Sequence, residues 1–218
     1  MMIYNIHPEL SPFIGKNYPQ APLKVLFLGE SHYLPAVYNH KVGLEWYECS
    51  TASYAFSAEA LAWLNTAAII RHDVIESSYK NPAHNIYRNI GKVYGEVFAK
   101  GDYPQALEYI AFGNYFLRPA EVCGESIIIN SWDEEGRSFQ QLAALEKQLQ
   151  PALIVFVSKK AHESFVRVAQ AQGATALLSK AKSVPHPNSA WWNRSITQYE
   201  GRSGKEELER VLRNPLSC

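Results

Sequence analysis

The stretch that decides the fold runs from residue 24 to residue 33 and reads Lys24-Val25-Leu26-Phe27-Leu28-Gly29-Glu30-Ser31-His32-Tyr33. Its first half is a continuous apolar run, which is typical of a parallel strand buried on both faces. A carboxylate, a hydroxyl, an imidazole and a phenol follow in four consecutive positions. Because ligands of open α/β sheets bind beyond the carboxyl ends of the strands, the stretch predicts a strand that leads into a binding or catalytic site.

The composition is that of an ordinary globular protein. Hydrophobic residues make up 47% of the 218 positions and charged residues 19%, and this length suffices for one well-buried domain. No apolar run approaches the ~20 residues that span a bilayer, so we expect a soluble, cytoplasmic protein that does not associate with membranes. The three cysteines are too widely spaced to indicate a disulfide framework or a metal site, and they are Cys49, Cys123 and Cys218.

Charge is balanced over the whole chain but not along it. The formal net charge is zero, which argues against a generally basic nucleic-acid-binding protein. Between residues 159 and 205, however, eight basic residues stand against two acidic ones. Such a segment can form a local anion-binding surface, although a solvated face with partners elsewhere in the fold is the simpler explanation.

Helical and strand patterns alternate along the chain. Four prolines predict that residues 1–22 form an irregular N-terminal arm of a single domain that spans residues 1–218. Further strands are expected at 110–114 and 153–157, and a short apolar stretch at 176–178 precedes a late polar motif. Helices are expected over about 57–70, 83–99, 104–109, 139–149, 161–172 and 205–212. The alternation predicts an α/β fold, specifically a three-layer α/β/α sandwich with a short, mainly parallel sheet.

Polar groups follow the strand-like runs at four places. These are Gly29-Glu30-Ser31-His32-Tyr33, Asn114, Ser158-Lys159-Lys160 and His186-Pro187-Asn188-Ser189. Taken singly, each is explained by a helix cap or a turn. Because the carboxyl ends of parallel strands share one edge of a sheet, we expect the four groups to meet in one crevice.

In their order and context these motifs resemble the uracil-DNA glycosylase superfamily, over roughly residues 24–212. In that family an apolar strand leads into a Gly-rich motif, often Gly-Gln-Asp-Pro-Tyr or Gly-Glu-Ala-Pro-Gly, which residues 29–33 resemble. The family's base-reading Asn is similar to Asn114, and its His-Pro-Ser loop is similar to the motif that begins at His186. The resemblance implies a glycosylase-like fold. It also implies hydrolysis, without metal or cofactor, of the N-glycosidic bond of an extruded uracil or damaged base in DNA.

The resemblance also implies roles for individual residues. Glu30 and His186 would be catalytic: the carboxylate would position water and stabilise the cationic sugar, and the imidazole would donate a hydrogen bond to the leaving base. Asn114 would read the base, because its amide offers one acceptor and two donors. The other residues of the substrate pocket would be Gly29, Ser31, His32, Tyr33 and Phe112. The DNA strand would be contacted by Lys159, Ser189, Trp191, Trp192 and Arg194, with the two tryptophans filling the vacated stack.

One departure from the family pattern leaves two alternatives open. Ser31 stands where many members carry a catalytic Asp or Asn, which leaves Glu30 as the only carboxylate of the motif. The first alternative is a glycosylase-fold protein that binds a nucleobase or nucleic acid without cleaving it. The second is an esterase-type hydrolase, in which Ser31 is the nucleophile, His186 the base and Gly113-Asn114 the oxyanion donors. The orienting acid expected three residues before that histidine is a serine here.

Overall fold

A single sheet forms the centre of the molecule. In the computed structural model, which describes residues 3–77 and 81–215, the described strands form one five-stranded sheet. In their order across the sheet the strands are β1 (Phe13–Ile14), β3 (Ala111–Asn114), β2 (Val25–Gly29), β4 (Leu153–Phe156) and β5 (Ala181–Ser183). Of these strands, β1 pairs antiparallel with β3, and the other pairings are parallel. The prediction of a short, mainly parallel sheet is confirmed.

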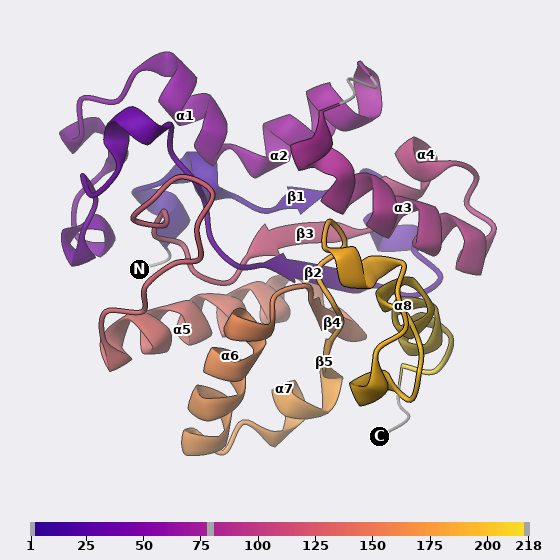
Figure 1. Cartoon of the computed structure of the whole chain (residues 1–218). Coiled ribbons are helices and arrows are strands. Elements are labelled where there is room, and N and C mark those ends of the chain that lie inside the picture. The colour runs from indigo at the N-terminus through magenta and orange to yellow at the C-terminus, as the bar shows by residue number, and fades with distance from the viewer. Residues whose placement is uncertain (1–2, 78–80, 216–218) are drawn as a thin grey trace.

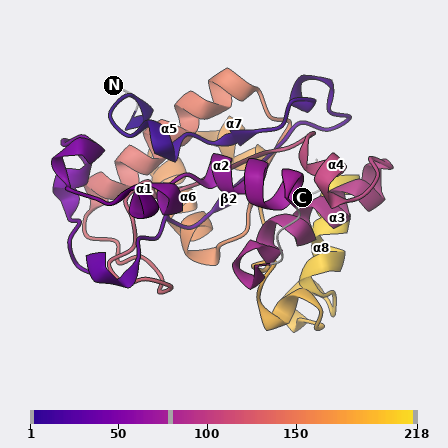
Figure 2. The same cartoon turned by 90° about the horizontal axis from the view of Figure 1, so that it is seen from above.

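Helices cover both faces of this sheet. The α-helices are α1 (Ala58–Leu64), α2 (Thr66–Ala68), α3 (Asn85–Phe98), α4 (Tyr103–Leu107), α5 (Trp132–Leu149), α6 (Lys159–Ala171), α7 (Thr175–Lys180) and α8 (Gly204–Arg213). A π-helix, Ile69–Glu76, continues α2. Short 3-10 helices lie at Ile3–Asn5, Pro8–Leu10, Tyr18–Gln20, Ala36–Tyr38, Leu44–Tyr47, Thr51–Ser53, Pro82–His84, Ala190–Trp192 and Thr197–Tyr199. Figures 1 and 2 show α3, α4 and α8 together on one side of the sheet and α5, α6 and α7 on the other.

Alternation of side chains along β2 builds two cores. Val25 and Phe27 point into the core shared with α3, α4 and α8, whereas Leu26 and Leu28 point into the core shared with α5 and α6. All four side chains are at most 2% exposed, because successive residues of a strand face opposite sides of the sheet. Burial on both faces explains the uninterrupted apolar run, and the arrangement is compatible with the expected three-layer sandwich.

The N-terminal arm is more regular than expected. It supplies β1, in which Phe13 pairs with Phe112 of β3. Other residues of the arm form a third apolar cluster with α1 and with the segment 34–56, around the fully buried Trp46. The prediction that residues 1–22 form an irregular arm is therefore wrong for Phe13 and Ile14, which form β1. Among its described residues the arm also forms three 3-10 helices, two of which contain a proline in the first turn, and a two-residue strand at the edge of a sheet tolerates a neighbouring Pro12.

The helix expected over 57–70 is interrupted. It ends at Leu64, because the backbone of Asn65 leaves the helical region. The Asn65 side chain accepts a hydrogen bond from the Ala68 N–H and so caps the next helix, α2. Apolar spacing alone does not reveal this break, since asparagine is compatible with both a helix interior and a cap.

The helix expected over 139–149 begins seven residues earlier. Ser131 caps α5 by accepting from the Glu134 N–H, and three acidic residues lie in the first turn. Both features stabilise a helix N-terminus and were visible in the sequence. The apolar stretch at 176–178 is part of α7, and the strand before the late polar motif is β5 instead. The remaining four helices agree with their predicted positions to within a few residues.

The topology places a crevice at the carboxyl ends of the central strands. The strands that follow β2 in the chain, β3 and β4, lie on opposite sides of it. The connections after β2 and β3 therefore run in opposite directions, which opens a crevice at this point of an α/β sheet. In the described part of the chain, no helix combines the length and the apolarity that crossing a bilayer requires.

Candidate functional site

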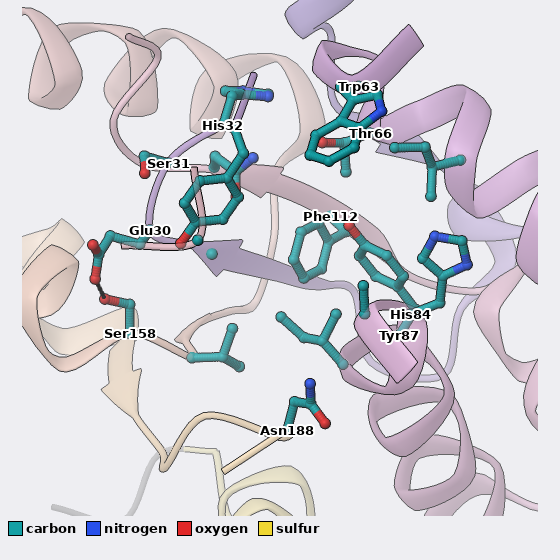
Figure 3. A pocket seen from close by; sticks show the side chains of 18 of the residues that line it. Glu30, Ser31, His32, Trp63, Thr66, His84, Tyr87, Phe112, Ser158 and Asn188 are labelled. Atoms are coloured by element: carbon teal, nitrogen blue, oxygen red, sulfur yellow. Dashed lines mark hydrogen bonds between the residues drawn. The ribbon is translucent and has the colours of Figure 1, made fainter. Parts of the chain in front are cut away.

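A cavity of about 900 Å³ occupies this crevice. Nine of the residues to which the resemblance assigns a role line it, as do Ser158, Lys160 and Asn188 of the same motifs; the nine are Gly29, Glu30, Ser31, His32, Tyr33, Phe112, Asn114, Lys159 and His186. They come from the ends of β2 and β3, the start of α6 and the loop after β5. Figure 3 shows Glu30 and Ser158 at one end of the cavity, His84 at the other, and Phe112 between them. The prediction that the strand-end motifs meet in one crevice is confirmed.

The carboxylate of Glu30 is held by three donors. One oxygen accepts from the Ser126 hydroxyl and, at 3.0 Å, from the Ile127 N–H. The other accepts from the Ser158 hydroxyl at 2.7 Å, the bond drawn in Figure 3. These three hydrogen bonds fix the position of the Glu30 carboxylate at its end of the cavity.

The loop that reaches Glu30 is anchored by a buried ion network. The Arg118 guanidinium, whose side chain is fully buried, donates to Glu134 at 2.7 Å and to Glu121 at 2.6 Å. It also donates to the Ile128 carbonyl at 2.7 Å, one residue beyond the amide that binds Glu30. Arg118 therefore fixes the segment that positions the carboxylate.

Asn114 presents a free amide to the cavity. Its side chain makes no hydrogen bond to any of the described residues 3–77 and 81–215, and its Oδ1 lies directly over the Cα of Gly29. A Cβ at position 29 would collide with that oxygen, so the glycine is required for this orientation of the amide. Phe112 lies beside it, in an edge-to-face contact with Tyr87 at 5.0 Å between ring centroids.

His186 is a neutral hydrogen-bond donor. Its Nδ1 accepts from the Asn188 N–H at 3.1 Å, so the ring proton resides on Nε2. Burial lowers the pKa of His186, and the charge of Glu30 opposes that shift only in part. Its loop is tied to α3 by a 2.8 Å hydrogen bond from the Asn89 amide to the Pro187 carbonyl. The Nε2–H is the group that can donate to a ligand.

Ser31 and His32 are buried without hydrogen-bond partners in the described part of the chain. Their side chains are 6% and 3% exposed, and neither the Ser31 hydroxyl nor either His32 ring nitrogen is satisfied. Burial lowers the pKa of His32 to about 4, so the ring is neutral. The electrostatic neighbours of the His32 ring, namely the Leu64 backbone, His7 and Glu9, belong to α1 and the N-terminal arm and do not line the cavity. The same geometry gives Ser31 no base, so the esterase alternative gains no support.

The residues predicted to contact DNA differ in their exposure and in whether they line the cavity. Trp192 is 3% exposed and packs in the core beside α8, where Gly204 leaves room for its ring. Its expected contact with DNA is therefore wrong, and only the 56% exposed Trp191 could act as a wedge. Arg194 is exposed, and neither it nor Ser189 lines the cavity.

One whole wall of the cavity was missed by sequence reasoning. It runs along α1, α2 and the π-helix and presents Glu59, Ala62, Trp63, Thr66, Ile69 and Asp73. The far end of the cavity is completed by His84 and Tyr87, from the start of α3. The sequence predicted a single helix over about 57–70 and assigned no role to the residues that form this wall.

The described residues contain no group of three His, Cys, Asp or Glu side chains that could hold a metal ion. Cys49 and Cys123 are free thiols, and Cys218 lies outside the described residues. Comparison of the chain with protein-family models, with characterised proteins and with solved structures finds no match. The function is therefore inferred from the geometry of the site.

Proposed function

We propose that this chain is a uracil-DNA glycosylase-like enzyme that hydrolyses the N-glycosidic bond of an extruded uracil or damaged base in DNA. The observation that supports this best is that the free amide of Asn114 and the neutral donor of His186 line the same aromatic-walled cavity. An amide reads the hydrogen-bonding edge of a base, and a base reaches such a cavity only after it leaves the stack.

The proposed mechanism is stabilisation of charge as the bond breaks. When the bond between C1′ and the base nitrogen breaks, its electron pair moves onto the base, and His186 Nε2–H donates to the oxygen that becomes negative. The sugar becomes cationic, and the fixed negative charge of Glu30 stabilises it through space. Water then adds at C1′, and the proton that it loses passes through solvent to the base, which is released as a neutral molecule.

The test is base release from oligonucleotides. Strands that carry uracil, hypoxanthine or an alkylated base are incubated with the wild type and with Asn114→Ala, His186→Gln and Glu30→Gln. We expect each substitution to reduce release by about 10²- to 10³-fold, the usual loss for one electrostatic group. Asn193→Ala, an exposed asparagine outside the cavity, is the matched control and should leave release unchanged. The proposal fails if the wild type releases no base from the panel.

A second candidate function is binding without cleavage. It is favoured by the three donors that occupy the Glu30 carboxylate and by the serine at position 31. Both features leave the motif without a carboxylate free to activate water. In the same panel, this candidate predicts saturable binding of the base-containing strands that Asn114→Ala weakens, without any base release.

A further inference from the structure

The cavity is larger than one base requires. Its volume of about 900 Å³ lies near the upper end of the roughly 300–1,000 Å³ found for drug-sized ligands. Asn114, Glu30 and His186 account for only part of the lining. The remaining part extends to the wall formed by α1, α2 and the π-helix, and nothing in the proposed hydrolysis of uracil uses that wall.

Aromatic rings flank this unused part. Trp63 projects from α1 and is 43% exposed at the mouth of the cavity. Across from it lie Phe112 and Tyr87, as Figure 3 shows. Ring faces carry partial negative charge, and tryptophan binds cations more strongly than other aromatic residues do. The space between these rings suits a planar group.

The charges along the two ends of the cavity differ. Lys159 and Lys160 lie at the Glu30 end, where Lys159 pairs with Glu163 and Lys160 donates to the Ile127 carbonyl at 2.7 Å. The Trp63 wall carries Glu59 and Asp73 instead. Among the described residues, neither of these carboxylates has an ion pair or a side-chain hydrogen bond. Both carboxylates are therefore available to a ligand, whereas the cation near His84, Arg88, donates to the Asn81 carbonyl and does not line the cavity.

Neither His84, at this end, nor His186, near Glu30, adds a positive charge to the lining. Burial lowers the pKa of His84 although Asp73 opposes the shift, and burial lowers the pKa of His186 as well. Both rings are neutral at pH 7. The Ser31 hydroxyl, which is buried and has no hydrogen-bond partner among the described residues, belongs to a residue of the same lining.

We propose that the cavity selects a planar, positively charged heteroaromatic ring, namely an N-alkylated purine base, with Trp63 stacking on it and Asp73 compensating its charge. This inference rests on the proposed glycosylase function and names its substrate class. A purine fills more of the cavity than a pyrimidine does, and the cation is attracted by both the ring faces and the carboxylate.

A cationic base also suits a motif that has few groups able to act as an acid or a base. When the C1′–N bond of an N-alkylated purine breaks, the electron pair neutralises the positive charge of the ring. The base therefore leaves as a neutral molecule, water adds to the sugar cation at C1′, and one proton is released to solvent. A neutral base leaves more readily than an anionic one, so the bond can break with less help from acidic groups. This suits a site that has Ser31 in place of an acid and a Glu30 that is held by three donors.

Ligand binding at pH 6 tests the charge preference. The probes are 7-methylguanosine, which is cationic at that pH, and guanosine, which differs by the methyl group and the charge. We expect the wild type to bind 7-methylguanosine at least tenfold more tightly. Asp73→Asn should remove about tenfold of that preference, and Trp63→Ala should weaken binding by about two- to thirtyfold. Asp133→Asn and Trp132→Ala, two exposed residues outside the cavity, are the matched controls and should change neither value.

Base release separates this inference from the proposed function. Release of uracil without any preference for 7-methylguanine overturns the inference and leaves the glycosylase function standing. A preference of binding for 7-methylguanosine that depends on Asp73, without base release from any strand, supports the inference on the ligand and overturns the proposed hydrolysis. Equal binding of both nucleosides by wild type and Asp73→Asn overturns the inference directly.

Discussion

Removal of the Arg118 guanidinium is the sharpest test of how the site is built. The side chain is fully buried and donates five hydrogen bonds, to Glu134 twice, to Glu121, and to the carbonyls of Pro119 and Ile128. Arg118→Met keeps a side chain of similar length but leaves the carboxylate of Glu134, itself fully buried, without its cation. The Glu134 carboxylate would then accept hydrogen bonds only from two neutral donors, the Tyr47 hydroxyl and the Asn130 N–H.

The expected cost follows from that uncompensated charge. Breaking a buried ion pair by removal of one partner destabilises a protein by about 3–5 kcal/mol. For a chain of this size each kcal/mol lowers the melting temperature by roughly 2–4 °C, so Arg118→Met should melt about 6–20 °C below the wild type. Because the same guanidinium holds the loop that binds Glu30, base release should fall as well, even at temperatures at which the variant remains folded.

Urea denaturation and thermal unfolding measure the first effect. The matched control is Arg194→Met, since Arg194 is exposed and has no ion pair among the described residues. Its free energy of unfolding should change by no more than about 0.5 kcal/mol. A loss below about 1 kcal/mol for Arg118→Met would refute the view that this network holds the loop in place.

Three further predictions concern the cavity. Gly29→Ala should weaken base binding at least tenfold, while the free energy of unfolding changes by less than about 1 kcal/mol. The reason is that the new Cβ displaces only the Asn114 amide. Unaltered binding would contradict this prediction. His32 has a folded-state pKa of about 4 against an ordinary value of about 6.5, so it contributes stability above pH 6.5 that is lost as the pH falls towards 4. The loss is about 3 kcal/mol at most, and His32→Gln should abolish this part of the pH dependence of unfolding. Since burial lowers the pKa of His186, base release should keep its neutral-pH rate at pH 6.5 and decline only in more acidic solution; a decline centred above pH 6.5 would contradict the neutral-donor role.

Most strands of the sheet, and the part of the site that lies at the strand ends, could be predicted from local patterns. The apolar runs of β2 and β4 are buried on both faces, and this burial is what produces a continuous apolar pattern in the first place. The parallel arrangement then implies that Glu30, Asn114 and His186 meet at one edge, although more than 150 residues separate the first from the last. Chain order and strand direction are sufficient for that conclusion.

Other parts depended on contacts that no local pattern contains. Trp191 and Trp192 are adjacent and chemically identical, yet one is exposed and the other packs against α8. Apolar spacing did not show that Asn65 ends one helix and caps the next, both of which line the cavity. The partners of Glu30 lie 96 to 128 residues away in sequence.

The sequence alone therefore determined the α/β class, the mainly parallel sheet and the edge at which the polar motifs gather, because these follow from periodicity and from the direction of strands. Only the tertiary structure decided which of those polar groups are free to act. It ties Glu30 to three donors, leaves Asn114 and the Nε2–H of His186 available, and adds Trp63 and Asp73 to the lining of the same cavity. The reason is physical: the availability of a side chain depends on the hydrogen bonds and burial that distant segments impose on it.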